Sequence, residues 1–77
     1  MGMKNKVKKF LKTKTRLEIK EIVKHPDLTE LEKWIIYYTF GEDRYVINTC
    51  AKLSISERQF FNIKDHALIK LYYILKL

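Results

Sequence analysis

The sequence predicts a small all-α domain of about four helices. The chain has 77 residues, of which 47% are hydrophobic, and it contains only two glycines and one proline. Scarce turn residues and apolar positions at helical spacing favour helices over strands. A chain of this length buries only about 60–65% of the surface that it exposes when unfolded, so we expect a single hydrophobic core.

Residues 1–26 are expected to form a basic N-terminal arm. This segment holds nine of the sixteen basic residues and only two acidic ones, which gives it a net charge of +7. Its apolar side chains are too numerous for a purely solvating tail, and they predict a short helix over residues 15–24. The helix should end at His25, because the residue before Pro26 disfavours helical geometry. A solvated, partly disordered tail is the alternative.

Residues 27–77 are expected to form the folded helix-turn-helix domain. Its first helix should begin at Asp27 or Thr29, each followed three residues later by a glutamate, and should end at Gly41. The apolar residues expected on its inward face are Leu31, Trp34, Ile35 and Tyr38. The next helix should begin near Asp43 or Arg44, where acidic residues suit the helix dipole, and should run to Leu53.

Residues 45–71 fit a helix-turn-helix unit. Cys50 is small enough for the place where the first helix passes closest to the second. Ser54 lies in the turn, at a position where glycine is common because the backbone there is often strained. Ser56 and Gln59 predict a capping box at the start of the second helix. The residues expected to point into the core are Leu53 and Ile55 in the turn, and Phe60, Ile63, Ala67, Leu71 and Ile74 along one stripe of the second helix.

The segment LSISERQFFNIKDHALIKL, residues 53–71, resembles region 4 of bacterial primary sigma factors, the helix-turn-helix that reads the promoter −35 element. The upstream segment LTELEKWIIYYTFGED, residues 28–43, resembles the helix that precedes that unit. Among sigma-like proteins, the paired Phe60 and Phe61 and the small size are most similar to the late-gene regulators of the ArpU and RinA type from phages of Gram-positive hosts. The resemblance implies a phage-encoded or prophage-derived transcriptional regulator that binds double-stranded DNA.

The resemblance also implies where DNA would be read. The candidate residues on the second helix are Ser56, Glu57, Arg58, Phe61, Asn62 and Lys64, with Glu57, Arg58 and Asn62 at the base-reading positions. Arginine can donate two hydrogen bonds to guanine, glutamate can accept one from cytosine, and asparagine can pair with adenine. Phe61 and Asp65 depart from the basic character of sigma recognition helices, so we expect a different target sequence.

Affinity for phosphates is expected to come from the N-terminal arm. Residues 27–77 contain seven basic and seven acidic residues and carry no net charge. Phosphate attraction supplies much of the affinity of most DNA-binding proteins, and it makes binding salt-dependent. The candidate phosphate-binding residues are Lys8, Lys9, Lys12, Lys14 and Arg16.

Catalysis, metal binding and a cofactor are not expected. Cys50 has no histidine or other ligand at a suitable spacing, since His25 and His66 both lie far from it in the sequence. The paired carboxylates lie at predicted helix starts, where acidic residues are common in any protein. No glycine-rich phosphate loop is present, and no nucleophile is paired with a base.

The partners predicted besides DNA are RNA polymerase and a second copy of the chain. Ile69, Tyr72 and Tyr73 lie opposite the core stripe of the last helix, so a symmetric homodimer, RNA polymerase or the N-terminal helix is expected to cover them. The alternative function is a protein-interaction module that binds RNA polymerase or another factor without reading bases.

The sequence predicts a cytoplasmic protein with no membrane span. Its longest apolar run, residues 34–40, is far shorter than the ~20 residues that a spanning helix needs. A single cysteine fits a reducing compartment. A basic amphipathic arm lying on an anionic membrane, over residues 3–14, is a third possibility.

Overall fold

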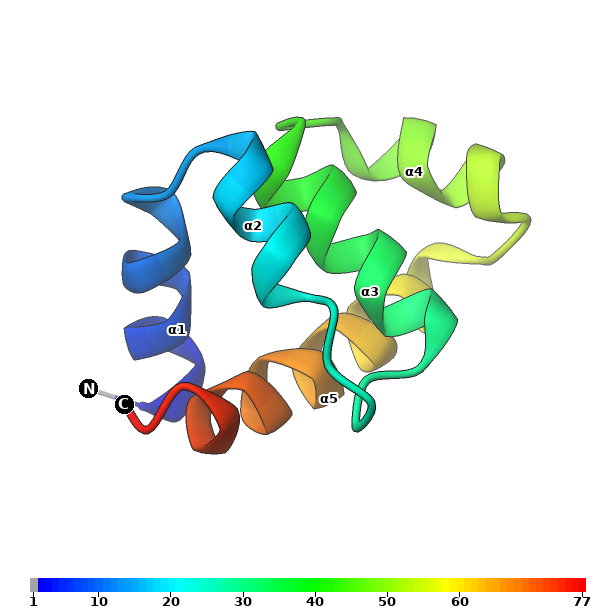
Figure 1. Ribbon diagram of the computed structural model, residues 1–77. Coiled ribbons are helices and arrows are strands. Elements are labelled where there is room, and N and C mark those ends of the chain that lie inside the picture. The colour runs from blue at the N-terminus through cyan, green and yellow to red at the C-terminus, as the bar shows by residue number, and fades with distance from the viewer. Residues whose placement is uncertain (1) are drawn as a thin grey trace.

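Five α-helices and one π-helical turn follow one another in the computed structural model, which describes residues 2–77 (Figure 1). They are α1 (Met3–Lys12), α2 (Arg16–Ile22), α3 (Glu30–Ile36), the π-helical turn η1 (Tyr37–Gly41), α4 (Val46–Leu53) and α5 (Glu57–Ile74). No strand occurs in the described part of the chain. The predicted all-α fold is confirmed, with one helix more than expected.

Capping boxes fix the starts of three helices. Thr15 caps α2, Thr29 caps α3 and Ser56 caps α5, in each case with a reciprocal hydrogen bond from the residue three positions later. Of the two predicted starts for α3, Thr29 is therefore correct. The prediction for α4 was two to three residues too early, because Asp43 adopts a left-handed backbone (φ 55°) that cannot begin a helix.

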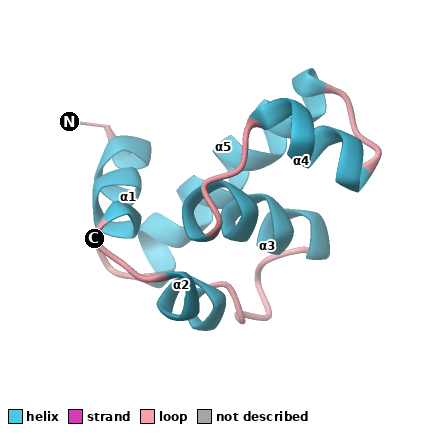
Figure 2. Ribbon diagram, turned by 90° about the horizontal axis from the view of Figure 1, so that it is seen from above, coloured by secondary structure: helices cyan, strands magenta, loops and turns pink. Residues whose placement is uncertain are grey.

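The N-terminal segment is part of the core and not a separate arm. Val7 and Leu11 of α1 are fully buried, and they share one hydrophobic cluster with Ile19 of α2 and Leu71 of α5. Both ribbon views place α1 beside α5 (Figures 1 and 2). The expected boundary at Pro26 does not separate two packing units, because Val7 and Leu11 lie one turn apart and present a single apolar stripe to α5.

A second, smaller cluster lies between α3, α4 and α5. It joins Ile35 of α3 with Cys50 of α4 and Phe60 of α5. Here α3 is turned so that Ile35 and Ile36 face the core, which leaves Leu31 and Trp34 on the outside, Trp34 with 44% of its side chain exposed. The prediction that Leu31 and Trp34 pack inward was wrong.

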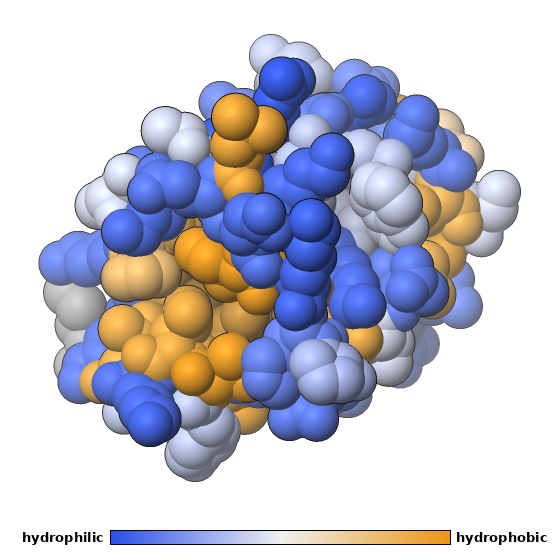
Figure 3. All heavy atoms as spheres, in the orientation of Figure 1, coloured by the Kyte–Doolittle hydropathy of each residue, from blue (hydrophilic) through white to orange (hydrophobic). Residues whose placement is uncertain are grey.

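The C-terminal part of α5 has one buried side and one open side. Leu68 and Leu71 are fully buried, and Tyr72 packs against the same cluster, whereas Tyr73 is 66% exposed. Tyr72 therefore does not belong to the outward face expected for it. Hydrophobic side chains are exposed on the face between α1, α2 and α5, and hydrophilic side chains border them (Figure 3). None of the helices in the described residues is both long and apolar enough to cross a membrane.

Candidate nucleic-acid interface

A tight turn with one left-handed residue joins α4 to α5. α4 ends at Leu53, and Ser54 takes a left-handed conformation with φ 57° and ψ 45°. The amide of Ile55 then donates to the carbonyl of Cys50 at 3.1 Å, which closes the end of α4. Glycine adopts this left-handed conformation at a lower energetic cost than serine, so Ser54 is slightly strained where the chain reverses.

The first turn of α5 is fixed by its cap. The amide of Gln59 donates to Oγ of Ser56 at 3.1 Å, and the amide of Ser56 donates to Oε1 of Gln59 at 2.9 Å. The predicted capping box is confirmed. The Ser56 oxygen thus accepts one hydrogen bond within the cap, and its hydroxyl proton and second lone pair remain for a ligand.

Cys50 joins the two helices by packing. It touches Ile35 and Phe60, and partly buried apolar side chains surround this cluster. They are Val46, Leu53, Ile55 and Ile63. Burial raises the pKa of the Cys50 thiol, and the carboxylate of Glu57 raises it further. A protonated thiol is a weak nucleophile and a weak metal ligand, so Cys50 acts as a small core residue.

The three side chains predicted to read bases lie on the first two turns of α5. Glu57, Arg58 and Asn62 are all exposed. In the described residues, none of the three makes a side-chain hydrogen bond or an ion pair. Arg58 and Asn62 are one turn apart, so they lie on the same face and can contact neighbouring base pairs.

Phe61 and Lys64 lie on the neighbouring, less polar side of α5. Phe61 is 44% exposed and meets Phe60 edge-on, with ring centroids 5.1 Å apart. Nζ of Lys64 lies over both rings, 5.1 Å from the centroid of Phe61. Burial lowers the pKa of Lys64 and the nearby Lys8 lowers it further, while Asp65 opposes them. Lys64 therefore covers apolar rings in addition to presenting a charge.

The structure brings only part of the predicted basic set to this surface. Lys8 lies close enough to Lys64 to affect its pKa, and Nζ of Lys4 pairs with Asp65 at 3.4 Å. The ribbon views place α1 beside the later turns of α5 and not beside its start, and α1 leads on to the α1–α2 turn (Figures 1 and 2). The predicted residues beyond Lys8 follow this path: Lys9 and Lys12 are exposed, Lys14 lies over the ring of Phe10, and Arg16 lies near Gly41.

Two exposed apolar residues at the start of α4 were not predicted as part of a site. Tyr45 and Ile47 are among the most exposed large hydrophobic side chains of the chain. Ile47 lies two residues before the buried Thr49, about 200° away around the helix, and it therefore faces outward.

Comparison of the chain with protein-family models, with curated proteins and with solved structures gave no match.

Proposed function

We propose that the chain is a sequence-specific DNA-binding transcriptional regulator, phage-encoded or prophage-derived, that reads the major groove with the first turns of α5. The observation that carries the proposal is the pair Arg58 and Asn62, exposed on a helix whose start is fixed by the Ser54 turn and the Ser56 cap. Fixed backbone geometry lets such side chains contact bases without first ordering the helix.

The charge distribution supports phosphate contacts beside the reading helix. Lys8 and Lys64 lie close together where α1 packs against α5, and Asp65 is already paired with Lys4. The two lysines form a basic pair on the α1-facing side of α5, and such groups commonly hold the phosphate backbone. DNA binding should therefore weaken with salt, by about three-fold per phosphate contact between about 50 and 200 mM.

An amide chemical-shift titration of ¹⁵N-labelled protein with mixed-sequence duplex DNA tests the proposal. At about 50 mM salt we expect the amides of residues 56–65 to shift together with those near Lys8, and the shifts to shrink at about 200 mM. Arg58→Ala should reduce them, whereas Lys6→Gln, a change on the exposed side of α1, should not. Shifts confined to the lysines of α1 and α2, or no shifts, would contradict a DNA-reading role for α5.

The alternative is a protein-interaction module that binds RNA polymerase or another factor. It is favoured by the exposed Tyr45 and Ile47 and by the absence of net charge over residues 27–77. A homodimer through α5 is a related possibility, now limited to Ile69 and Tyr73 because Tyr72 packs inward. Light scattering of the native chain and of Tyr73→Glu tests it, since a monomeric mass for both would exclude the dimer.

A further inference from the structure

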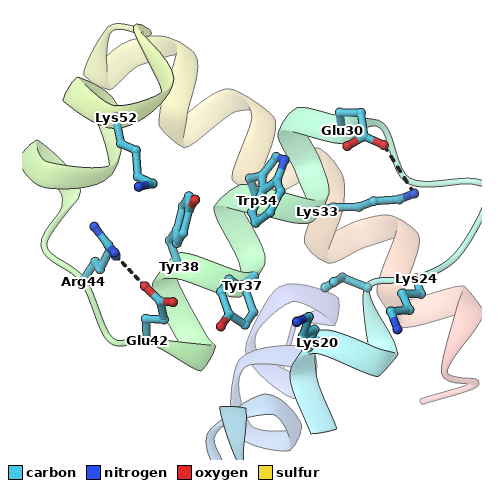
Figure 4. Close-up of a pocket in the computed structure, with 11 residues that line it drawn as sticks. Lys20, Lys24, Glu30, Lys33, Trp34, Tyr37, Tyr38, Glu42, Arg44 and Lys52 are labelled. Atoms are coloured by element: carbon cyan, nitrogen blue, oxygen red, sulfur yellow. Dashed lines mark hydrogen bonds and ion pairs between the residues drawn. The ribbon is translucent and has the colours of Figure 1, made fainter. Parts of the chain in front are cut away.

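A groove of about 380 Å³ lies between α2, α3, η1 and α4, and no residue of α5 lines it. Three aromatic side chains, Trp34, Tyr37 and Tyr38, form its floor and one wall, and basic side chains reach over it from both sides (Figure 4). The groove is thus separate from the surface formed by Glu57, Arg58 and Asn62.

The aromatic rings leave a corner open to solvent. The ring of Tyr38 is occupied, because Trp34 stacks on it at 5.4 Å and Arg44 lies over it, 4.9 Å from its centroid. Trp34 and Tyr37 stand nearly perpendicular, with centroids 6.2 Å apart and planes at 78°. Because Trp34 is 44% exposed, a flat group can stack on its indole with one edge against the ring of Tyr37.

The backbone of η1 holds this corner in place. The amide of Glu42 donates to the carbonyl of Tyr37 at 3.0 Å, across the wide turn of a π-helix. The ring of Tyr37 lies directly over Gly41, where an added Cβ would come within 3.1 Å of its Cδ1. Short π-helical turns of this kind are frequent at functional sites.

The groove carries excess positive charge. Its lining includes five basic and two acidic side chains, a net charge of +3. Three of the basic groups already have a carboxylate partner, namely Lys24 with Glu21, Lys33 with Glu30 and Arg44 with Glu42. Lys20 and Lys52 form no ion pair with any described residue, and they approach the groove from α2 and α4 (Figure 4). Nζ of Lys52 also lies over the ring of Tyr38, 5.6 Å from its centroid. Two ammonium groups without a carboxylate partner among the described residues therefore stand on opposite sides of the aromatic corner.

We propose that this groove binds single-stranded nucleic acid by accepting one unstacked base on Trp34, with the flanking phosphates held by Lys20 and Lys52. A stacked base and two cations are the recurring elements of single-strand binding surfaces. A duplex keeps the faces of its bases inside the helix, so it cannot use the indole in this way. An acidic peptide would satisfy the charge but would leave the flat aromatic corner unused, and the volume suits one nucleotide.

Trp34 is the only tryptophan of the chain, so its fluorescence reports directly on the groove. Titration of the full chain with a ten-nucleotide oligothymidine at about 50 mM salt should quench this fluorescence to saturation, and about 200 mM salt should weaken the binding. Lys20→Gln and Lys52→Gln should each weaken binding by about three-fold or more, because each removes a phosphate contact, whereas the matched Lys6→Gln should have less than about a two-fold effect.

Trp34→Leu, measured by anisotropy of a labelled oligothymidine, should lose at least about five-fold in affinity. Circular dichroism melts of every variant show whether the fold is retained. Arg58→Ala should leave the quenching unchanged, and this separates the groove from the duplex-reading surface proposed above. A loss of quenching in Arg58→Ala would assign the binding to α5 and overturn the proposal.

Four other results would also overturn it. The first two are absence of quenching and equal binding of a duplex of the same length. The third is equal affinity for free thymidine monophosphate, which would mean that the groove takes a free nucleotide. The fourth is preferential binding of a glutamate-rich peptide, which would mean that the groove takes a protein.

Discussion

The ammonium of Lys70 lies 2.8 Å from Oε1 of Glu32 and joins α5 to the first turn of α3. Glu32 is only 4% exposed, and its Oε1 also accepts the amide of Thr29 at 2.7 Å as part of the α3 capping box. Nζ of Lys70 donates in addition to the carbonyl of Asp27 at 3.1 Å. One lysine thus connects the loop before α3, the cap of α3 and the C-terminal half of α5.

Lys70→Met should destabilise the protein, because it leaves a buried carboxylate without its cation. Breaking a buried pair costs about 3–5 kcal/mol, and since Lys70 is itself only half-buried we expect about 2 kcal/mol. Urea unfolding followed by circular dichroism measures the change. Lys33→Met is the matched control, because its partner Glu30 is exposed and such pairs contribute less than about 1 kcal/mol. Equal losses of unfolding free energy in the two variants would show that the pair with Glu32 stabilises the fold no more than an exposed ion pair does.

The same pair should make the protein sensitive to acid. Burial alone would raise the pKa of Glu32, but the hydrogen bonds from Lys70 and from the Thr29 amide lower it below its ordinary value. The folded state then binds this proton more weakly than the unfolded state, so stability is full above about pH 5 and falls as the pH drops toward about 3. Urea unfolding across this range should show a shallower fall for Glu32→Gln than for Glu30→Gln. Parallel curves for the two variants would contradict the assignment.

Thr49→Val should stabilise the protein. The side chain of Thr49 is fully buried in α4, and its hydroxyl has no hydrogen-bond partner among the described residues. Replacing this hydroxyl by a methyl group removes an unsatisfied polar atom without changing the shape, for an expected gain of about 1 kcal/mol in the free energy of unfolding. Thr49→Ser keeps the hydroxyl and loses the methyl, so it should destabilise by about 1 kcal/mol. A loss of stability in Thr49→Val would mean that the hydroxyl is bonded in solution.

Leu11→Ala tests whether α1 belongs to the core. Leu11 of α1 is fully buried against the rest of the molecule. Its truncation to alanine should lower the free energy of unfolding by about 2–4 kcal/mol. Leu17→Ala makes the same chemical change on α2, where the side chain is exposed, and should cost less than about 0.5 kcal/mol. Urea denaturation compares the two. Similar small costs would mean that α1 is detached in solution.

Features that depend on neighbouring residues were predictable from the sequence. The Ser56 cap needs only the residue three positions later, and the left-handed Ser54 follows from the need to reverse the chain between two helices. The spacing of Phe60, Ala67 and Leu71 likewise placed them on one buried stripe. These are short-range relationships, and they locate the start and the orientation of the candidate reading helix.

Features that depend on distant segments were not predictable. The many lysines of residues 1–26 suggested a separate basic arm, and the burial of Val7 became apparent only with α5 packed against it. Trp34 and Ile35 are adjacent apolar residues, and periodicity alone does not decide which of them faces inward. Ile35 faces inward because it packs against α4 and α5. Trp34 therefore points outward and lines a groove that the sequence did not indicate.

Base reading and phosphate binding should separate in two single variants. Arg58→Ala removes two donors to a guanine, so it should weaken binding to the selected site by about 1–3 kcal/mol and relax the preference at one base pair. Lys8→Gln removes a phosphate contact, so it should weaken binding to all sequences alike and reduce the salt slope by about 0.9. Anisotropy titrations with the selected and a scrambled duplex measure both effects, with Lys6→Gln as the control on the same helix. If Arg58→Ala weakened both duplexes equally, Arg58 would be a phosphate contact, and α5 would hold DNA without reading it.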